Sequence, residues 1–315
     1  MRISLIDFDS KPGFPNLALM KLSTYLKEQG HEVGLNKMRA DAFYVSVIFD
    51  WHREKLEKSL LPYCANVEVG GTGWNLEKSL PPEVENCPAD YSLYGIDYGI
   101  GFTSRGCIRH CPFCVVPRKE GYIRPVADVA ELINPKSNFL ILLDNNLLAS
   151  PNCRQVLSDI KRLNLSVNFN QGLDIRLIDD EIAYYLSQIK ARDWKNKNNR
   201  LYFSFDNPDI KNKVQEGVAL LGQYRIRPSR LMFYMLCNFD TTFEEDYYRF
   251  QILDRLGCKP FVMVYKSKER KAPPITHAFA RWVNKRYYKI CSWPEYRDPR
   301  KNRETPLTEL LWEGE

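Results

Sequence analysis

Three cysteines within eight positions, Cys107, Cys111 and Cys114, are the residues of this 315-residue chain whose spacing points most directly to chemistry. They form the pattern CxxxCxxC in the segment GFTSRGCIRHCPFCVVPRKEG. Thiolates are soft ligands that suit iron–sulfur clusters. A [4Fe-4S] cubane has four irons, so three cysteines leave one iron without a protein ligand. The spacing therefore predicts a cluster with an open coordination position, which is what a reactive centre needs.

Other sites could use the same cysteines. A structural zinc site closes with four ligands, and His110 or a distant cysteine could supply the last one, but the chain has no pair of CxxC motifs. A redox dithiol at Cys111 and Cys114 leaves Cys107 unexplained. Three unrelated core cysteines would be rarer still. The cluster is the favoured interpretation.

The cysteines follow the first of six apolar, β-branched or aromatic runs that alternate with predicted helices. The runs are residues 99–103, 139–144, 166–170, 201–206, 231–237 and 261–265, and the helices lie near residues 126–133, 153–163, 179–189, 211–224 and 242–256. This alternation predicts an α/β fold, and six parallel units predict a partial (β/α)6 barrel over residues 95–265. Active sites of barrels lie at the carboxyl ends of the strands, where the cysteine segment begins.

A small Rossmann-like layer is expected before the barrel, in residues 1–80. Its elements are a strand at ISLIDF, a helix capped by Asn16 and ended by Gly30, strands near residues 32–35 and 42–49, a helix near residues 51–61 and a strand ending at Gly70-Gly71. Residues 81–94, which include Pro81, Pro82 and Pro88, form the expected linker. Residues 266–315 form a basic extension, predicted to be a helical C-terminal cap.

The segment Cys107-x-x-x-Cys111-x-Phe113-Cys114, with its aromatic residue before the last cysteine, resembles the signature of the radical S-adenosylmethionine (SAM) enzymes. The resemblance covers about residues 95–265, and the six strand–helix units match the partial barrel of that family. It implies that the three cysteines hold a [4Fe-4S] cluster and that SAM chelates the remaining iron. A reduced cluster would then cleave SAM to methionine and a 5′-deoxyadenosyl radical, which abstracts hydrogen from a substrate. The resemblance also implies an electron donor such as flavodoxin or ferredoxin.

Polar residues recur where the predicted barrel strands end, at the rim where SAM is expected. The residues predicted to contact SAM are Phe113, Asp144, Asn145, Asn170, Gln171, Arg176 and Asp206. Other polar residues at the same rim are Asn146, Asp174, Asn207, Asn238, Asp240 and Thr241. The Asp144-Asn145-Asn146 segment replaces a glycine-rich segment of the family, which weakens that part of the comparison. Each of the polar residues could equally be a helix cap or a turn residue, and both interpretations stay open.

No catalytic side chain is assigned from the sequence. Cys237 ends an alternating strand and could point into the barrel as a thiol that quenches or traps a substrate radical. A cysteine outside a metal site or disulfide is more often a small buried hydrophobe, and we favour this second interpretation. The cysteines beyond these four show no tight spacing, so no second cluster is expected.

The N-terminal layer resembles the cobalamin-binding domain that precedes the barrel in one radical SAM subfamily, with Gly70-Gly71 where that domain's glycines approach the cofactor. The DxHxxG motif of that domain is incomplete, because Asp50-x-His52 matches but Lys55 stands at the glycine position. His52 is therefore expected to be a surface residue. Members of the subfamily often lack the histidine, so cobalamin stays a candidate, but a degenerate domain that has lost the cofactor is preferred.

The composition is that of a globular protein, with 44% apolar and 27% charged residues. No apolar run approaches the ~20 residues that span a bilayer, and the N-terminus lacks the layout of a signal peptide. Nine cysteines, an odd number with three in one cluster, fit a reducing compartment better than a disulfide framework. We expect a cytoplasmic protein without a membrane partner.

The basic charge is concentrated near the C-terminus, where Lys266–Arg303 contain twelve Lys or Arg and three acidic residues. This segment interleaves charge with aromatic residues and could bind nucleic acid or another phosphate-bearing substrate. Alternatively, a helix could cover the barrel edge with Phe279, Trp282 and Tyr287 while its basic residues face water. The covering helix is favoured.

Other functions are open. The run CxFCVVPxxxG also resembles the tRNA-modifying methylthiotransferases, but the set of three N-terminal cysteines for their second cluster is missing. A peptide- or antibiotic-modifying methylase is equally consistent with the sequence. A metal-stabilised nucleic-acid-binding protein without catalytic activity is the candidate from a different class.

Overall fold

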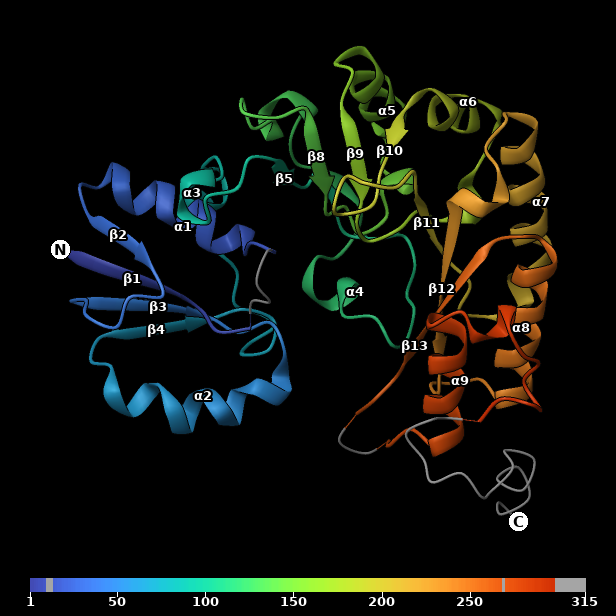
Figure 1. Ribbon diagram of the computed structural model, residues 1–315. Coiled ribbons are helices and arrows are strands. Elements are labelled where there is room, and N and C mark those ends of the chain that lie inside the picture. The colour runs from blue at the N-terminus through green and yellow to red at the C-terminus, as the bar shows by residue number, and fades with distance from the viewer. Residues whose placement is uncertain (10–13, 268–269, 298–315) are drawn as a thin grey trace. The chain divides into compact units, whose positions relative to one another are not determined.

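The computed structural model describes residues 1–9, 14–267 and 270–297. The chain divides into two compact units, Met1–Val167 and Asn168–Glu315. Both are mixed α/β, and nearly all of the described strand pairs are parallel (Figure 1). The predicted α/β class is therefore confirmed, whereas the predicted domain boundaries at residues 80, 94 and 265 stay a prediction. No helix in the described ranges is long and apolar enough to cross a membrane.

The N-terminal sheet has the order β2-β1-β3-β4, and all of its described pairings are parallel. Its strands are β1 (Arg2–Asp7), β2 (Glu32–Leu35), β3 (Ala42–Ser46) and β4 (Val67–Gly70). Two helices accompany them, α1 (Leu17–Glu28) and α2 (Arg53–Ser59). The side chain of Asn16 caps α1 by accepting a hydrogen bond from Leu19 N at 3.3 Å. The strands and helices expected in this region are present, within a few residues at each end.

The helices α1 and α2 belong to two separate hydrophobic cores, and each core includes strands of the N-terminal sheet. Leu19, Leu22 and Leu26 of α1 share a core with Ile3 and Leu5 of β1. Leu56 of α2 belongs to a second core that includes Ile6, Val45 and Val47. Strands β1 and β3 therefore supply apolar side chains to both cores.

The segment predicted as a linker is packed against α1. It contains α3 (Pro82–Glu85), whose Val84 is only 2% exposed and belongs to the core formed by α1. Asp90 accepts hydrogen bonds from Ser23 Oγ and Lys27 Nζ, each at 2.7 Å. Burial alone would raise the pKa of Asp90, but hydrogen bonds from Lys27, Ser23 and Ser92 bring it down to about 2. This segment therefore contributes to the stability of the first unit.

A second sheet has the order β10-β9-β8-β5, and the boundary between the units falls inside β9 (Ser166–Phe169). Its other strands are β5 (Gly99–Gly101), β8 (Phe139–Leu142) and the two-residue β10 (Lys190–Ala191). Ile100 and Ile141 share a core with Leu17 and Met20 of α1, which joins this sheet to the N-terminal layer within the first unit. The following helix is α5 (Cys153–Arg162).

The second unit contains the parallel sheet β11-β12-β13. Its strands are β11 (Leu201–Ser204), β12 (Leu231–Cys237) and β13 (Lys259–Val264), and its helices are α6 (Asp180–Gln188), α7 (Lys211–Gln223), α8 (Phe243–Arg255) and α9 (Pro274–Asn284). All of these strands and the helices α6 to α8 were expected, within a few residues at each end. The expected helix near residues 126–133 is shorter, a single 3-10 turn at Val129–Leu132. One continuous barrel stays a prediction, because the described pairings form separate sheets.

Helix α9 closes the free edge of β13. Asn284 Nδ2 donates to Val262 O at 2.9 Å, and Asn284 Oδ1 accepts from Val262 N at 2.8 Å, so the amide side chain takes the place of a further strand. Phe279 and Trp282 are buried and contact the ring of Phe250. This is the arrangement expected of an edge-covering helix. The last basic residues of this region, from 298 onward, lie outside the described residues.

Candidate functional site

The cysteine segment is a loop closed at its base by a short antiparallel pair. The strands β6 (Ser104–Arg105) and β7 (Arg124–Pro125) pair with each other, and Cys107 N donates to Gly121 O at 3.2 Å. Gly106 has a positive φ of 88°, and a Cβ there would lie 2.3 Å from Tyr122 O. A side chain at position 106 would therefore clash with the backbone and strain the base of the loop. The loop base was not predicted, because each strand is only two residues long.

The three thiols lie inside this loop, and all three side chains are half-buried and outside any disulfide. Cys114 N donates to Cys111 O at 2.9 Å, which makes the CxxC half of the motif a turn. The sulfur of Cys107 accepts from Arg109 N at 3.3 Å and from Asn146 Nδ2 at 3.5 Å. Hydrogen bonds to sulfur are one of the means by which proteins tune iron–sulfur centres.

The three cysteines are not preassembled as a ligand set. Among the described residues, no group of three or more His, Cys, Asp or Glu side chains is arranged to hold a metal ion. Thiols have little attraction for one another, and the bonds that would draw them together are those to the metal itself. The chemistry of the donor set suits a cluster, because three accessible thiols share one loop and N–H groups point at one sulfur.

Asp144, predicted to contact SAM, fixes the start of the cysteine loop. The carboxylate follows β8, is 4% exposed, and accepts from Thr103 N at 3.1 Å and Thr103 Oγ1 at 2.6 Å. It also accepts from Ser104 N and Ser104 Oγ, each at 2.6 Å. Burial raises the pKa of this carboxyl, and the four hydrogen bonds oppose that effect. The neighbouring Asn145 acts similarly, because its Oδ1 accepts from Gly106 N at 2.9 Å.

A network of ion pairs connects the cysteine loop to the segment that was expected to be a linker. Arg105 donates to Glu120 at 3.0 Å and to Glu85 of α3 at 2.9 Å, and Lys21 of α1 also pairs with Glu85 at 2.8 Å. The Arg105 guanidinium lies 4.1 Å from the ring centroid of Phe102. Sequence reasoning missed this group, since no local pattern connects Glu85 with Arg105.

The remaining SAM candidates lie at or just after strands of the second unit. Asn170 is half-buried, and Gln171 is exposed. Arg176 donates Nε and a terminal nitrogen to the two oxygens of Asp174, at 2.6 and 2.9 Å. Asp206 accepts from Leu236 N at 2.7 Å; burial raises its pKa, while the charges of Arg249 and Arg176 oppose that effect. Arg176 and Asp206 are therefore within electrostatic reach of each other.

Cys237 is completely buried on the side of β12 that faces α8. Burial is the main cause that raises the pKa of its thiol, and the charge of Asp246 on α8 adds to it. Its neighbour Arg249, also 0% exposed, donates to Leu236 O at 2.8 Å and to Asp246 at 2.5 Å. This surrounding agrees with the favoured interpretation of Cys237 as a buried core residue. Sequence reasoning missed the buried pair of Arg249 and Asp246.

In the N-terminal layer, His52 pairs through Nδ1 with the carboxylate of Asp9, which also accepts from Phe49 N at 2.9 Å. Trp51 stacks on Phe49 with the ring centroids 4.6 Å apart, and both rings are exposed. Gly71 has a φ of 98°, and a Cβ there would lie 2.2 Å from Val47 O. These residues follow β1, β3 and β4, at the carboxyl edge of the sheet, where ligands of open α/β sheets bind.

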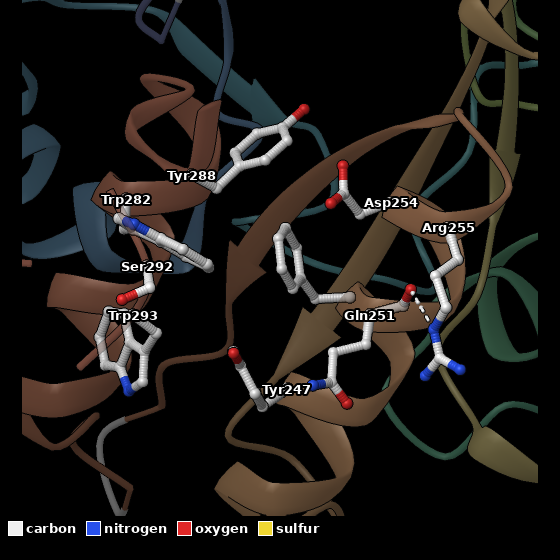
Figure 2. Close-up of a pocket in the computed structure, with 9 residues that line it drawn as sticks. Tyr247, Gln251, Asp254, Arg255, Trp282, Tyr288, Ser292 and Trp293 are labelled. Atoms are coloured by element: carbon white, nitrogen blue, oxygen red, sulfur yellow. Dashed lines mark hydrogen bonds between the residues drawn. The ribbon is translucent and has the colours of Figure 1, made fainter. Parts of the chain in front are cut away.

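A pocket of about 290 Å³ lies between α8 and the segment from α9 onward (Figure 2). Its walls are mainly aromatic, and the residues that line it are Tyr247, Phe250, Gln251, Asp254, Arg255, Trp282, Tyr288, Ser292 and Trp293. Lys289 Nζ pairs with Asp254 at 2.5 Å. None of the residues predicted for cluster or SAM binding lines this pocket.

No protein-family model matches the chain, and no curated protein is significantly similar to it. Among solved structures, SuiB of Streptococcus suis bound to S-adenosylmethionine is similar with 11% identity over 61% of this chain and 46% of SuiB, at a TM-score of 0.42. SuiB bound to its precursor peptide SuiA gives 14% identity over 76% and 57%, at 0.40. The cobalamin-dependent S-adenosylmethionine radical enzyme OxsB gives 14% identity over 98% and 54%, at 0.39. The chain spans about half the length of these structures.

Proposed function

We propose that this protein is a radical SAM enzyme whose cluster is held by Cys107, Cys111 and Cys114. The observation that carries the proposal is the CxxxCxxC loop itself, which follows the parallel strand β5 through the short strand β6 and has three thiols outside any disulfide. Its base is fixed by Asp144 and Asn145, and hydrogen-bond donors point at the sulfur of Cys107. A loop held in this way supports a reactive metal centre better than an isolated group of core cysteines.

The residues of the loop have distinct parts in this proposal. The three thiolates would bind the cluster, which when present supplies the single electron for reductive cleavage of SAM. Asp144 and Asn145 hold the backbone of Ser104 and Gly106, so the first cysteine starts from a fixed position. The N–H of Arg109 and the amide of Asn146 stabilise negative charge on the Cys107 sulfur.

The predicted SAM contacts of Phe113, Asp144, Asn145, Asn170, Gln171, Arg176 and Asp206 stay part of the proposal. Arg176 offers a guanidinium suited to a carboxylate, and Asp206 offers a carboxylate suited to ribose hydroxyls.

Cobalamin is a second, separate candidate ligand, for the N-terminal layer. It is favoured by the pairing of His52 Nδ1 with Asp9 at the carboxyl edge of the sheet. A histidine that ligates a metal through one ring nitrogen commonly bonds a carboxylate through the other. Titration with hydroxocobalamin, followed by absorbance in wild type and His52→Ala, tests this ligand without turnover. If wild type leaves the hydroxocobalamin spectrum unchanged, the N-terminal layer is a degenerate domain that has lost the cofactor.

The main proposal is tested by anaerobic reconstitution with iron and sulfide, reduction with dithionite and addition of SAM. Wild type should bind about four irons per chain and form 5′-deoxyadenosine, as a [4Fe-4S] site requires. Cys107→Ala should do neither. Cys64→Ala, which removes a half-buried cysteine outside the motif, should behave as wild type. Zinc binding without any cluster in wild type would overturn the proposal.

A further inference from the structure

Cationic side chains from three strands meet at the amino edge of the β11-β12-β13 sheet. The parallel register pairs Leu201 with Leu231, which places the preceding residues Arg200 and Arg230 next to each other. Lys259 is paired with Met232 and therefore lies at the same edge. This is the end of the sheet opposite to Asp206 and Cys237. The function proposed above does not use it.

Further arginines surround these three residues. In each case burial is the first cause that lowers the pKa of the cation, and neighbouring cations lower it further. Arg286, after α9, acts in this way on Arg200 and Lys259. The full set, which we term the amino-edge cluster, is Arg192, Arg200, Arg227, Arg230, Lys259 and Arg286.

Nothing in the described residues neutralises the amino-edge cluster at close range. Arg200 is only 8% exposed, and its hydrogen bond goes to a carbonyl, Ser229 O, at 3.3 Å. Within the described ranges, Nε of Arg192 and Nε of Arg230 are buried and have no hydrogen-bond partner. Burying cations without paired acids is costly, so an anionic ligand is the natural partner of such a cluster.

Asp193 is the acid whose charge reaches Arg200, but its oxygens are already used. They accept from Lys197 N at 2.8 Å and from Asn198 Nδ2 at 2.6 Å, both inside the turn of one short hairpin. Arg192 and Asn199 form the antiparallel bridge at the base of that hairpin. The carboxylate therefore stabilises the hairpin and leaves the arginines available.

The tip of the hairpin presents an aromatic ring together with more positive charge. Trp194 is 45% exposed, and Lys195 Nζ lies 5.0 Å from the centroid of its ring. Lys195 and Lys197 are both exposed. An exposed ring beside lysines and arginines is the combination that binds single-stranded nucleic acid, because bases stack on the ring while the cations neutralise phosphates.

We propose that the amino-edge cluster and Trp194 form a binding surface for single-stranded nucleic acid. Planar guanidinium groups match the geometry of phosphates, and the exposed ring favours a base-bearing polyanion over an acidic protein. The surface differs from the basic stretch singled out in the sequence, of which only Arg286 belongs to the cluster. Lys289 of that stretch pairs with Asp254 instead. The proposal is independent of the iron–sulfur site.

The test measures fluorescence anisotropy of a fluorescein-labelled oligouridylate of about 15 nucleotides, a length that covers typical single-strand sites. The full chain is used, without reductant or SAM, so the result does not depend on the cluster. The charge variant Arg230→Gln/Lys259→Gln/Arg286→Gln leaves the buried Arg200 in place. The matched control is Lys58→Gln/Arg162→Gln/Lys213→Gln, which removes three exposed cations that are each paired with a carboxylate. Thermal melting followed by circular dichroism verifies that both variants fold.

Wild type and the control should bind with similar affinity. The charge variant should bind at least about 10-fold more weakly, and the slope of log K against log salt should fall by about 2, since each phosphate contact on a single strand contributes about 0.7. Trp194→Ala should weaken binding about 5-fold or more. Trp51→Ala, which removes another exposed ring, should not.

Two results would overturn the proposal. One is a folded charge variant with the affinity and salt slope of wild type. The other is competition by poly-glutamate as effective as competition by unlabelled oligouridylate, which would identify the surface as a site for an acidic protein.

Discussion

The carboxylate of Asp144 accepts hydrogen bonds from both the backbone N–H and the hydroxyl of Ser104, each at 2.6 Å. Residue 144 follows β8 and residue 104 starts β6, so this contact joins the end of one strand to the start of the cysteine loop. The same carboxylate also holds Thr103. The position of Cys107 therefore depends on a side chain that lies 37 residues further along the chain.

Asp144→Asn should destabilise the protein and impair metal incorporation. The amide keeps the shape of the carboxylate and one acceptor oxygen, but its NH2 group in the place of Oδ2 cannot accept from Thr103 N. Leaving such a buried donor unsatisfied costs about 1–3 kcal/mol of unfolding free energy. Urea denaturation measures this, and iron per chain after reconstitution measures the effect on the loop. The control Asp159→Asn breaks an exposed pair with Arg162 and should cost at most about 1 kcal/mol.

Gly106→Ala should disrupt the loop more than Gly95→Ala does. Both glycines have positive φ, so both substitutions carry the backbone strain of about 1–2 kcal/mol. Only at position 106 does the added Cβ also clash with backbone, because nothing lies within 4 Å of a Cβ at Gly95. Reconstituted Gly106→Ala should therefore hold less iron and melt at a lower temperature than Gly95→Ala. Equal iron content in the two variants would contradict the close approach of Tyr122 to the loop base.

The elements predicted correctly are those whose signals are local. Asn16 before α1 marks a helix start in the sequence, and the structure forms this cap. The alternation along β12 is likewise local, since Leu231, Phe233, Met235 and Cys237 are buried while the residues between them are half-exposed. Patterns of this kind determine the type of an element before any tertiary contact forms.

The features missed in the sequence depend on partners that are distant along the chain. The role of Glu85 depends on its ion pair with Arg105, which no local pattern predicts. The amino-edge cluster depends on the register of β11 and β12, which places Arg200 beside Arg230. The motif identified the three cysteines, yet their spacing could not show that Asp144 holds the start of their loop.

The stability of the first unit should fall in acid, in part through Asp90. Its folded pKa of about 2 lies below the unfolded value of 3.8, so its stabilising effect is complete above pH 4 and is lost as pH falls toward 2. The unfolding free energies of wild type and Asp90→Asn, measured by urea denaturation, should differ by about 1–2 kcal/mol at pH 6 and by much less at pH 2.5. A difference that does not change with pH would contradict the hydrogen bonds from Ser23 and Lys27 as its cause.

Cys237→Ala should retain formation of 5′-deoxyadenosine if the enzyme proposal holds. The thiol is buried against α8, next to the carboxylate of Asp246, rather than on an exposed face of the sheet. Loss of a small buried side chain should cost about 1 kcal/mol of stability. Chromatographic quantification of the product and urea denaturation separate the two effects. A stable variant that binds the cluster but forms no product would instead assign Cys237 to the reaction.

Arg249→Met should be among the most destabilising single substitutions in the second unit. The guanidinium is 0% exposed and holds two strands through the carbonyls of Phe205 and Leu236. Its removal leaves the carboxylate of Asp246 buried without its cation, which costs about 3–5 kcal/mol. The double variant Arg249→Met/Asp246→Leu removes both charges and should recover much of that loss, because two apolar groups need no hydrogen bonds. Urea denaturation of both single variants and the double variant completes the cycle. Additive losses would show that the two side chains stabilise the fold independently. They would contradict the cost that we assign to a buried Asp246 without its cation.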